Sequence, residues 1–330
     1  MNVLITGGAG YIGSLLTGIL LQKGYTVTVI DDLLFGGDSL LAYITHPSFK
    51  FFKANVTEKE SIRPYFRDVE HVIHLAAIVG FPACQQLGPE MSWLYNFEGT
   101  KNVYDLAREN RARRFVFAST YSNYGIAEGE APVTEESPLN PQSLYAETKI
   151  AAEKYLMEEG KKSDTVPVLF RFATLFGLSP RTRFDLIINQ FVLEAIEKRA
   201  LIIYQKNYYR SFVHIRDIAK ALTMALELDL AKVGNQVFNV GSNRGNYTKE
   251  DLIRMIQKYV PGLTITYKDL HFGGDMRDIK VSFDKIERVL GYRAEVSVEE
   301  GIRELAEAIQ TKFLFDPHSL RNRNAQFIVQ

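Results

Sequence analysis

The chain has 330 residues, enough for a full hydrophobic core and for two lobes. Its 39 basic side chains are balanced by 39 acidic ones, so no net field attracts a nucleic acid or a membrane surface, and its apolar runs are too short to span a bilayer. Cys84 is the single cysteine, which excludes a disulfide framework and a thiol-based metal site. We expect a cytoplasmic protein with no metal, no nucleic-acid partner and no membrane contact.

The first 32 residues have the pattern of a strand, a glycine turn, a helix, a second strand and an acid. Apolar runs at 2–6 and 26–30 flank the turn, and the second run ends in Asp31 and Asp32. The turn contains Gly7, Gly10, Tyr11, Ile12 and Gly13. Glycines there permit a tight bend and a close approach of the backbone to a pyrophosphate at the helix N-terminus. An acid about 20 residues further on would accept hydrogen bonds from an adenosine ribose, so the unit predicts a dinucleotide site.

The same acids favour one of the two nicotinamide dinucleotides. A carboxylate at Asp31 or Asp32 would repel the 2′-phosphate of NADP, and no arginine directly follows this pair to receive it. We therefore expect NAD as the cofactor.

Further apolar runs alternate with helical segments along the chain. The runs lie at 51–56, 71–77, 114–120 and 166–172, and the longest helices are expected from Pro89 to about Arg111 and from Leu144 to about Lys161. Continuous apolar strands alternating with helices indicate a parallel sheet covered on both faces. The fold class expected is α/β, a Rossmann-type doubly wound parallel sheet.

The regular alternation ends near Thr174. We expect residues 1–173, with a return of roughly 211–240, to form the dinucleotide-binding domain. Residues 174–210 and 241–330 would form a smaller C-terminal substrate-binding lobe. The tail after Phe313 is polar and is expected to be loose.

Ligands of such a fold bind at the carboxyl ends of the strands. Small, polar or aromatic side chains stand at these predicted ends, namely Asn55, Ala76, Ala77, Ser119, Thr120, Phe172 and Thr174. Asn55 is placed to meet an adenine ring.

Tyr145 and Lys149 are four residues apart at the start of a predicted helix, so they share one helix face. A cation there stabilises a phenolate and lowers the tyrosine pKa, as proton transfer near neutral pH requires. With 17 tyrosines in the chain, a Tyr-x-x-x-Lys pattern is expected roughly once by chance, and a surface pair is the alternative. The position of the pattern, shortly after the hydroxyls of Ser119, Thr120 and Ser122, favours the catalytic interpretation.

Taken together, these motifs resemble the extended short-chain dehydrogenase/reductase family, in its nucleotide-sugar epimerase and dehydratase branch. The resemblance covers nearly the whole chain. It rests on Thr6 to Gly13, His74 to Ala77, Asn96 with Gly99, Thr100 and Asn102, Phe117 to Gly125, Tyr145 to Lys149, and Phe212 to Asp217.

The resemblance implies a role for each matching residue. Lys149 would hold the nicotinamide ribose, Thr120 would bond the substrate hydroxyl or ketone, and Tyr145 would be the acid and base. The expected cofactor site comprises Gly7, Gly10, Tyr11, Ile12, Gly13, Asp31, Asp32, Asn55, Val56, Leu75, Ala76, Ala77, Asn96, Ser119, Tyr145, Lys149, Phe172 and Thr174. The expected substrate site comprises Val79, Thr120, Ser122, Asn123, Tyr145, Thr174, Arg183, Arg210 and Arg277, with Arg210 on the diphosphate of a nucleotide sugar. A homodimer built through the helices at 96–111 and 144–161 is also implied.

The chain departs from the family pattern at four places, one of which is Asn55, where the family often has aspartate. The run after Thr120 contains no acid, whereas dehydratases carry one there to protonate the leaving hydroxide, which argues against a 4,6-dehydratase and weakens the case for a decarboxylase. Thr174 stands where the family commonly has an asparagine after the sixth strand. Phe272 replaces the arginine of an Arg-x-Gly-Asp segment, which leaves Arg277 or Arg183 to do its work.

The function expected is 4-epimerisation of a nucleoside diphosphate hexose, with NAD oxidising C4 to a transient 4-keto sugar and reducing it again. One alternative is a ketoreductase that reduces a nucleotide-linked 4-keto-6-deoxy sugar once. Such biosynthetic reductases usually draw on NADPH, against which Asp31 argues. The second alternative is a nucleotide-binding regulator without chemistry, against which the intact Thr120, Tyr145 and Lys149 argue.

Overall fold

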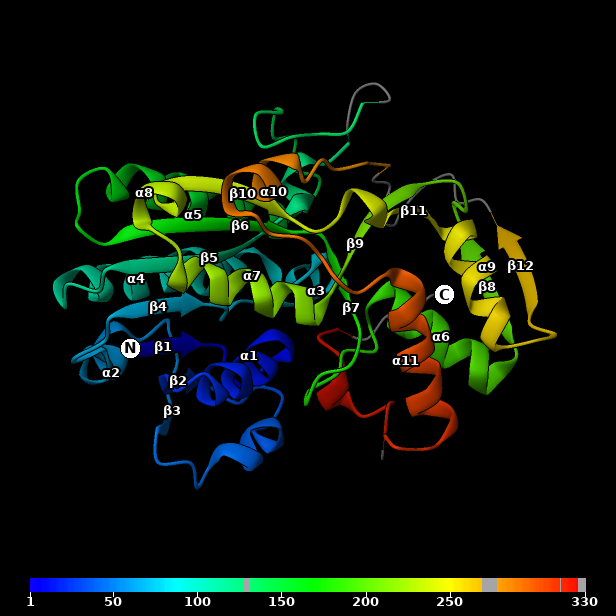
Figure 1. The fold of residues 1–330 in the computed structure, drawn as a ribbon, viewed down its shortest axis with the longest axis horizontal. Helices are drawn as coiled ribbons and strands as arrows, with labels where there is room; N and C mark the ends of the chain where they lie inside the picture. Colours follow the sequence, from blue (N-terminus) through cyan, green and yellow to red (C-terminus); the bar gives the residue numbers. More distant parts are fainter. Residues whose placement is uncertain (127–130, 269–277, 315, 326–330) are drawn as a thin grey trace.

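A parallel seven-stranded sheet forms the centre of the molecule (Figure 1). The computed structural model describes residues 1–126, 131–268, 278–314 and 316–325. The strand order is β10-β6-β5-β4-β1-β2-β3, and every pairing in this sheet is parallel. The strands are β1 (Asn2–Thr6), β2 (Thr26–Asp31), β3 (Phe49–Lys53), β4 (His71–His74), β5 (Arg114–Thr120), β6 (Val166–Phe172) and β10 (Gln236–Val240). The predicted doubly wound α/β sheet is confirmed.

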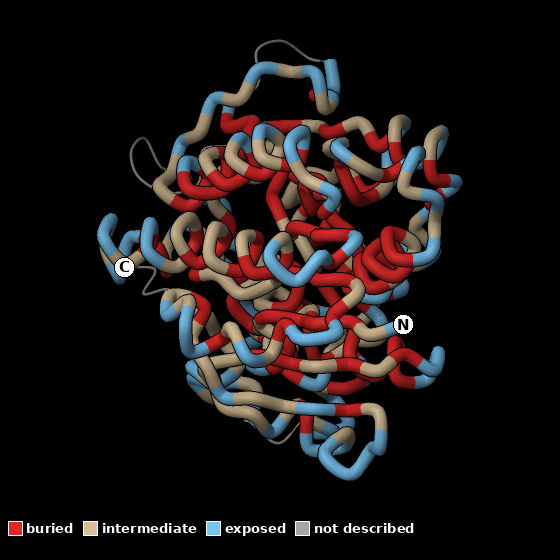
Figure 2. The backbone as a smooth tube through the Cα atoms, turned by 90° about the vertical axis from the view of Figure 1, so that its left-hand side faces the viewer, coloured by how far each residue is buried: buried red, intermediate tan, exposed pale blue. Residues whose placement is uncertain are grey.

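Helices cover both faces of this sheet because its strands alternate between two apolar layers. Val3 and Ile5 of β1 pack into one buried cluster with α1 (Tyr11–Gln22) and α7 (Ile215–Glu227). Leu4 points the other way, into a cluster with α4 (Gly99–Glu109) and α5 (Leu144–Gly160). Figure 2 shows the buried stretches gathered in the interior, with exposed backbone at the outer turns.

The helix expected from Pro89 to Arg111 is present in the structure. It runs through the end of α3 (Phe81–Trp93), the π-helical segment η3 (Leu94–Glu98) and α4, which ends at Glu109. A kink at Gly88, with φ +85°, precedes Pro89, which lacks the backbone N–H that a continuous helix requires.

The remaining elements form a smaller lobe beside the large sheet (Figure 1). Its strands make two sheets, ordered β11-β9-β7 and β12-β8. They are β7 (Thr174–Phe176), β8 (Ala200–Tyr204), β9 (Tyr209–His214), β11 (Asn246–Thr248) and β12 (Thr264–Lys268). Its main helices α6 (Ile187–Lys198), α9 (Lys249–Tyr259) and α11 (Val298–Gln310) bury their apolar faces in a third cluster.

Short helical segments complete the described part of the chain. They are η1 (Asp38–Tyr43), α2 (Lys59–Ile62), η2 (Arg63–Phe66), η4 (Tyr121–Tyr124), α8 (Leu230–Val233), η5 (Asn243–Gly245), α10 (Asp284–Leu290) and η6 (Leu320–Asn322). Among the helices within the described ranges, none combines the length and the apolar composition that a membrane crossing requires.

Candidate active site

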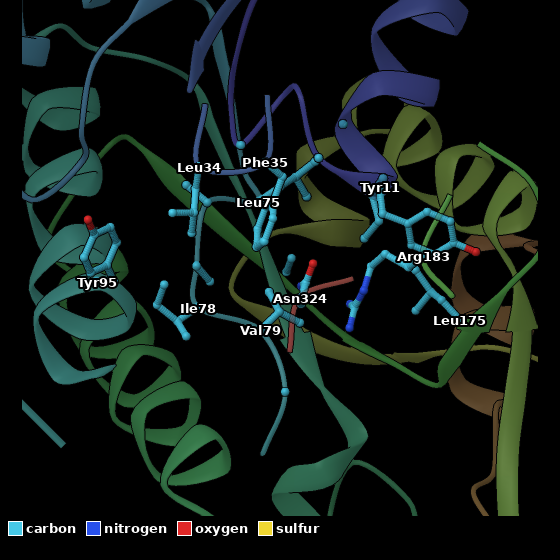
Figure 3. A pocket seen from close by; sticks show the side chains of 18 of the residues that line it. Tyr11, Leu34, Phe35, Leu75, Ile78, Val79, Tyr95, Leu175, Arg183 and Asn324 are labelled. Carbon is cyan, nitrogen blue, oxygen red and sulfur yellow. The ribbon is translucent and has the colours of Figure 1, made fainter. Parts of the chain in front are cut away.

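A large pocket opens at the carboxyl ends of the central strands, where the two lobes meet (Figure 3). The glycine turn, the ends of β2, β4, β5 and β6, and the start of α5 line one wall of this pocket. The loop between β7 and α6 lines the opposite wall together with Asn324, which lies near the C-terminus. We refer to these surfaces as the motif wall and the far wall.

The glycine turn is shaped by contacts that a side chain would prevent. Gly7 has φ +74°, and a Cβ atom on it would lie 2.6 Å from the Ala76 nitrogen. A Cβ atom on Gly13 would lie 2.4 Å from the Gly7 carbonyl oxygen. The turn leads directly into α1, whose N-cap Gly10 offers no side-chain acceptor to the first N–H groups. A backbone cradle at a helix N-terminus fits a pyrophosphate.

Asp31 ends β2 within the same pocket. Its carboxylate accepts hydrogen bonds from the Ala9 nitrogen at 2.9 Å and from the Leu33 nitrogen at 2.8 Å. Burial raises the pKa of Asp31, and these two hydrogen bonds oppose that shift. Asp32, the other predicted acid, lines the pocket and accepts from the Leu34 nitrogen at 3.2 Å. A carboxylate held in this position fits the hydroxyl groups of a ribose.

Tyr145 and Lys149 lie in the first turns of α5. The helix begins after Ser143, whose hydroxyl accepts from the Ala146 nitrogen at 3.2 Å. Tyr145 is 9% exposed and Lys149 is 2% exposed. The Lys149 ammonium donates to the Ala118 carbonyl at 2.9 Å, and burial lowers its pKa to about 8. The two side chains that the sequence predicted as a pair line one pocket.

Thr120 ends β5 and caps η4. Its hydroxyl accepts from the Ser122 nitrogen at 3.1 Å and donates to the Ser122 hydroxyl at 3.0 Å. Thr120 and Ser122 both line the motif wall, as Tyr145 and Lys149 do. A hydroxyl, a phenol and an ammonium on one wall can exchange a proton with a bound alcohol.

A buried ionic network lies behind Thr120. Glu153 receives the Arg171 guanidinium, with the Nη2 to Oε2 distance at 2.6 Å, and also accepts from the Ser119 hydroxyl. Asn123, predicted as a substrate contact, belongs to this network: its amide donates to Glu153 at 2.9 Å and to Ser119 at 3.2 Å. Asn123 is fully buried and lies behind the pocket lining.

Two other predicted residues, both within the described part of the chain, do not line the pocket. Asn96 is buried beneath it and holds the loop after β4 through two bonds to the Ile78 backbone, at 2.7 and 3.0 Å. Arg210 is 1% exposed and donates to the Tyr209 carbonyl at 2.9 Å. Arg277 lies outside the described residues, as does Phe272.

The remaining predicted residues come together in the pocket. They are Gly7, Gly10, Tyr11, Ile12, Gly13, Asn55, Val56, Leu75, Ala76, Ala77, Val79, Ser119, Phe172, Thr174 and Arg183. These positions come from separate strand ends and loops, which the parallel sheet brings to one edge.

Sequence reasoning missed several residues of the pocket. Phe35 and Tyr95 line it as well, and the Asn55 amide donates to the Tyr95 hydroxyl at 2.8 Å. Arg181 and Asn324 line the far wall. Arg181 lies far from Asp31 in the sequence, with strands β3 to β6 between them, so no local motif predicts that it lines this pocket. The polar tail that contains Asn324 was expected to be loose, yet it contributes to the pocket.

The far wall contains a buried ion pair. The Arg183 guanidinium donates to both carboxylate oxygens of Asp185, at 3.0 and 2.7 Å. Although burial opposes ionisation of both groups, the charge of each partner raises the pKa of Arg183 and lowers that of Asp185. In Figure 3, Arg183 and Asn324 extend into the space faced by Val79. Arg183 thus stays charged at the pocket wall, where Asp185 is its partner.

The acidic side chains of the described pocket lining lie at one end of it. Within the part of the chain that the structure describes, those lining it are Asp31 and Asp32, at the end of β2. Among the same residues, no group of three or more His, Cys, Asp or Glu side chains could hold a metal ion.

The model of the NAD dependent epimerase/dehydratase family matches residues 3–241. This chain belongs to that family. It is 27% identical to a UDP-glucose 4-epimerase of Bacillus subtilis, over 91% of this chain and 94% of the relative. It is 28% identical to UDP-glucuronic acid decarboxylase 2 of Arabidopsis thaliana, over 92% of this chain and 66% of the relative. The crystal structure of the UDP-glucose 4-epimerase of Thermotoga maritima with UDP-glucose has a TM-score of 0.83 and 25% identity, covering 95% of this chain and 100% of that one.

Membership of this NAD-dependent family agrees with the site geometry. The extended short-chain dehydrogenase resemblance of the sequence and the NAD expectation are both confirmed. The named relatives nevertheless differ in reaction, since epimerases and decarboxylases both occur among them. The family and the fold establish an NAD-dependent enzyme, and the choice of reaction depends on the individual side chains of the pocket.

Proposed function

We propose that this enzyme is a nucleotide-sugar 4-epimerase that inverts C4 of a nucleoside diphosphate hexose, with a UDP-hexose as the first substrate to test. One observation carries the proposal: Thr120, Tyr145 and Lys149 share the motif wall, while the acidic side chains of the described lining are those at the cofactor end. An epimerase needs the first three groups and no additional acid.

The residues of the pocket fit NAD. The turn from Gly7 to Gly13 would hold the pyrophosphate, Asp31 the adenosine ribose and Lys149 the nicotinamide ribose. When bound, NAD supplies a nicotinamide that accepts a hydride from C4 of the sugar and later returns it.

Tyr145 would move the proton in both half-reactions. As a phenolate it takes the proton of the sugar 4-hydroxyl, and as a phenol it gives the proton back to the 4-keto oxygen. Lys149 lies one helical turn away on α5 and remains a cation below its pKa of about 8, so its charge stabilises the phenolate. Thr120 would hold the oxygen at C4 by a hydrogen bond, which keeps the reacting atoms in contact distance.

Elimination of water would require a further carboxyl group. The side chains that follow Thr120 are Tyr121, Ser122 and Asn123, and Asn123 is occupied in the buried network with Ser119. The 4-keto sugar would therefore be reduced rather than dehydrated. Inversion follows if the keto sugar presents its opposite face when the hydride returns.

The purified enzyme tests this proposal directly. Denaturation should release NAD, and incubation with UDP-glucose or UDP-galactose should interconvert the two 4-epimers by NMR without added reductant. UDP-, GDP-, CDP- and dTDP-sugars tested together would identify the base. Turnover only of 4-keto sugars, and only with added NADH or NADPH, would contradict the epimerase and establish the ketoreductase.

We also propose a homodimer built through α4 and α5, the two helices that the sequence predicted for it, with α3 beside them, since α3 packs against α5. Large apolar side chains are exposed on and beside α3, namely Phe81, Leu87, Trp93 and Leu94. Their burial would favour association. Light scattering should give the mass of two chains, and Trp93→Asp should give one. Ile202→Asp, at an exposed apolar residue of the smaller lobe, is the matched control and should leave the dimer intact.

A further inference from the structure

The C-terminal residues fold back onto the far wall of the pocket. After α11 ends at Gln310, the chain returns toward the first lobe (Figure 1). We call residues 321–325 the C-terminal strap. Phe184 donates its backbone N–H to the Asn322 carbonyl at 2.8 Å, and Arg321 forms an ion pair with Asp38. The strap is thus attached both to the loop before α6 and to the segment after β2.

Arg181 fastens the strap from inside the pocket. Its Nε donates to the Arg321 carbonyl at 2.8 Å, and its Nη1 donates to the Asn324 side-chain oxygen at 2.8 Å. Its Nη2 lies 3.5 Å from the Arg323 carbonyl. A planar guanidinium that meets three acceptors in one segment fixes the path of that segment.

The same arginine faces the cofactor end of the pocket. Its guanidinium lies 3.9 Å from the ring centroid of Phe35, in the loop after β2. Arg181 is 6% exposed, and burial lowers its pKa to about 10, whereas the carboxylate of Asp31 opposes that shift. Arg181 therefore connects the strap to the residues that would surround the adenosine.

The end of the strap reaches the catalytic residues. Asn324 lines the pocket, and its backbone N–H donates to Asp185 at 3.1 Å. Ala325 is 7% exposed and belongs to a buried apolar cluster with Ile78 and Tyr145. The strap consequently extends from the far wall to the motif wall.

We propose that the C-terminal strap is part of the dinucleotide site and that Arg181 and Asn324 retain NAD on the enzyme between turnovers. This inference rests on the proposed function, because an epimerase must keep one cofactor through both hydride transfers. The strap bridges the two walls between which the dinucleotide would lie. Release of NAD would require breaking the hydrogen bonds between Arg181 and the strap.

Exchange of the cofactor in the holoenzyme tests this assignment. Enzyme carrying NAD is mixed with excess NADH, and the rise of bound NADH fluorescence reports NAD release. Arg181→Lys keeps a cation but loses the planar fork, and Asn324→Ala removes an acceptor. Each should release NAD at least about tenfold faster than the unmodified enzyme, since a charge-assisted hydrogen bond is lost. His318→Ala is the control, because His318 pairs with Glu197 at the exposed surface, outside the strap.

The outcomes separate the strap from the chemistry. Exchange is measured without a nucleotide sugar, so accelerated release supports the strap whether or not C4 inversion is found. Unchanged release in both variants overturns it, and a raised KM for the nucleotide sugar alone would assign the strap to the substrate site instead. If a thermal scan shows that cofactor-free Arg181→Lys does not fold, the exchange rate of Asn324→Ala decides the question.

Discussion

The two walls of the pocket are built in different ways. The motif wall takes its main residues from short local patterns, such as Gly7 to Gly13 and Tyr145 to Lys149. The far wall joins Arg181, Arg183 and Asn324, which are brought together only by the folded smaller lobe and the C-terminal strap. The motif wall holds Thr120, Tyr145 and Lys149, to which we assign the proposed chemistry. The far wall contains Arg181 and Asn324, to which we assign the retention of NAD.

The largest effect is expected at the centre of the motif wall. Tyr145→Phe removes the proton donor and acceptor, so turnover should fall by about a thousandfold or more. Bound NAD should remain, because the glycine turn and Lys149 are intact. Measured turnover and NAD content check both statements. Tyr155→Phe, on the same helix but bonded to Asp105, is the control and should leave turnover nearly unchanged. Loss of NAD together with turnover would show that Tyr145 has a structural role.

The next effect concerns the stability of the far wall. Asp185→Ala leaves the buried Arg183 guanidinium without its partner, and the free energy of unfolding should fall by about 3–5 kcal/mol. The side chains of this pair are only 11% and 3% exposed. Asp105→Ala removes a carboxylate whose side chain is 33% exposed and should cost at most about 1 kcal/mol. Equal losses in chemical denaturation of the two variants would contradict the assignment of a desolvated pair.

The same contrast explains how much of the site could be read from the sequence. Strands at 114–120 and 166–172 were predicted at their observed bounds, because each is a largely apolar run. The glycine turn and Asp31 were found because one strand-helix-strand unit fixes their spacing. Arg181 and Asn324 could not be found, since their role depends on tertiary contacts between distant segments. Asn123 was misplaced for a related reason: a polar residue next to Thr120 is indistinguishable in sequence from one that Glu153 holds in the interior.

An effect of intermediate size is expected in the pH dependence of stability, because Lys149 is buried. Its pKa in the folded protein is about 8, below the ordinary value of 10.5, because burial disfavours the charge. Between these values the unfolded chain keeps a proton that the folded chain has lost, so stability should rise with pH through this window. Below pH 8 the buried charge should lower the free energy of unfolding by roughly 3 kcal/mol, and this loss should be recovered by pH 10.5.

Comparison with Lys149→Met isolates this contribution. In cofactor-free protein, the stability advantage of the variant should be largest below pH 8 and should shrink above it. Parallel stability profiles by chemical denaturation would contradict the burial of a charged Lys149. Turnover of the unmodified enzyme should also decline above about pH 8, as the cation beside Tyr145 is lost.

The smallest effect is expected in the glycine turn of the motif wall. Gly7→Ala would force a side chain into a backbone with φ +74° and place its Cβ 2.6 Å from the Ala76 nitrogen, so the free energy of unfolding should fall by about 2 kcal/mol. NAD retention should fall as well, because relief of this contact moves the turn that would hold the pyrophosphate. Gly37→Ala is the matched control: its φ is −117°, and the nearest atom is a movable Leu33 methyl group at 3.2 Å. If Gly7→Ala retained NAD as firmly as Gly37→Ala, cofactor retention would depend on the far wall and its strap more than on the glycine turn.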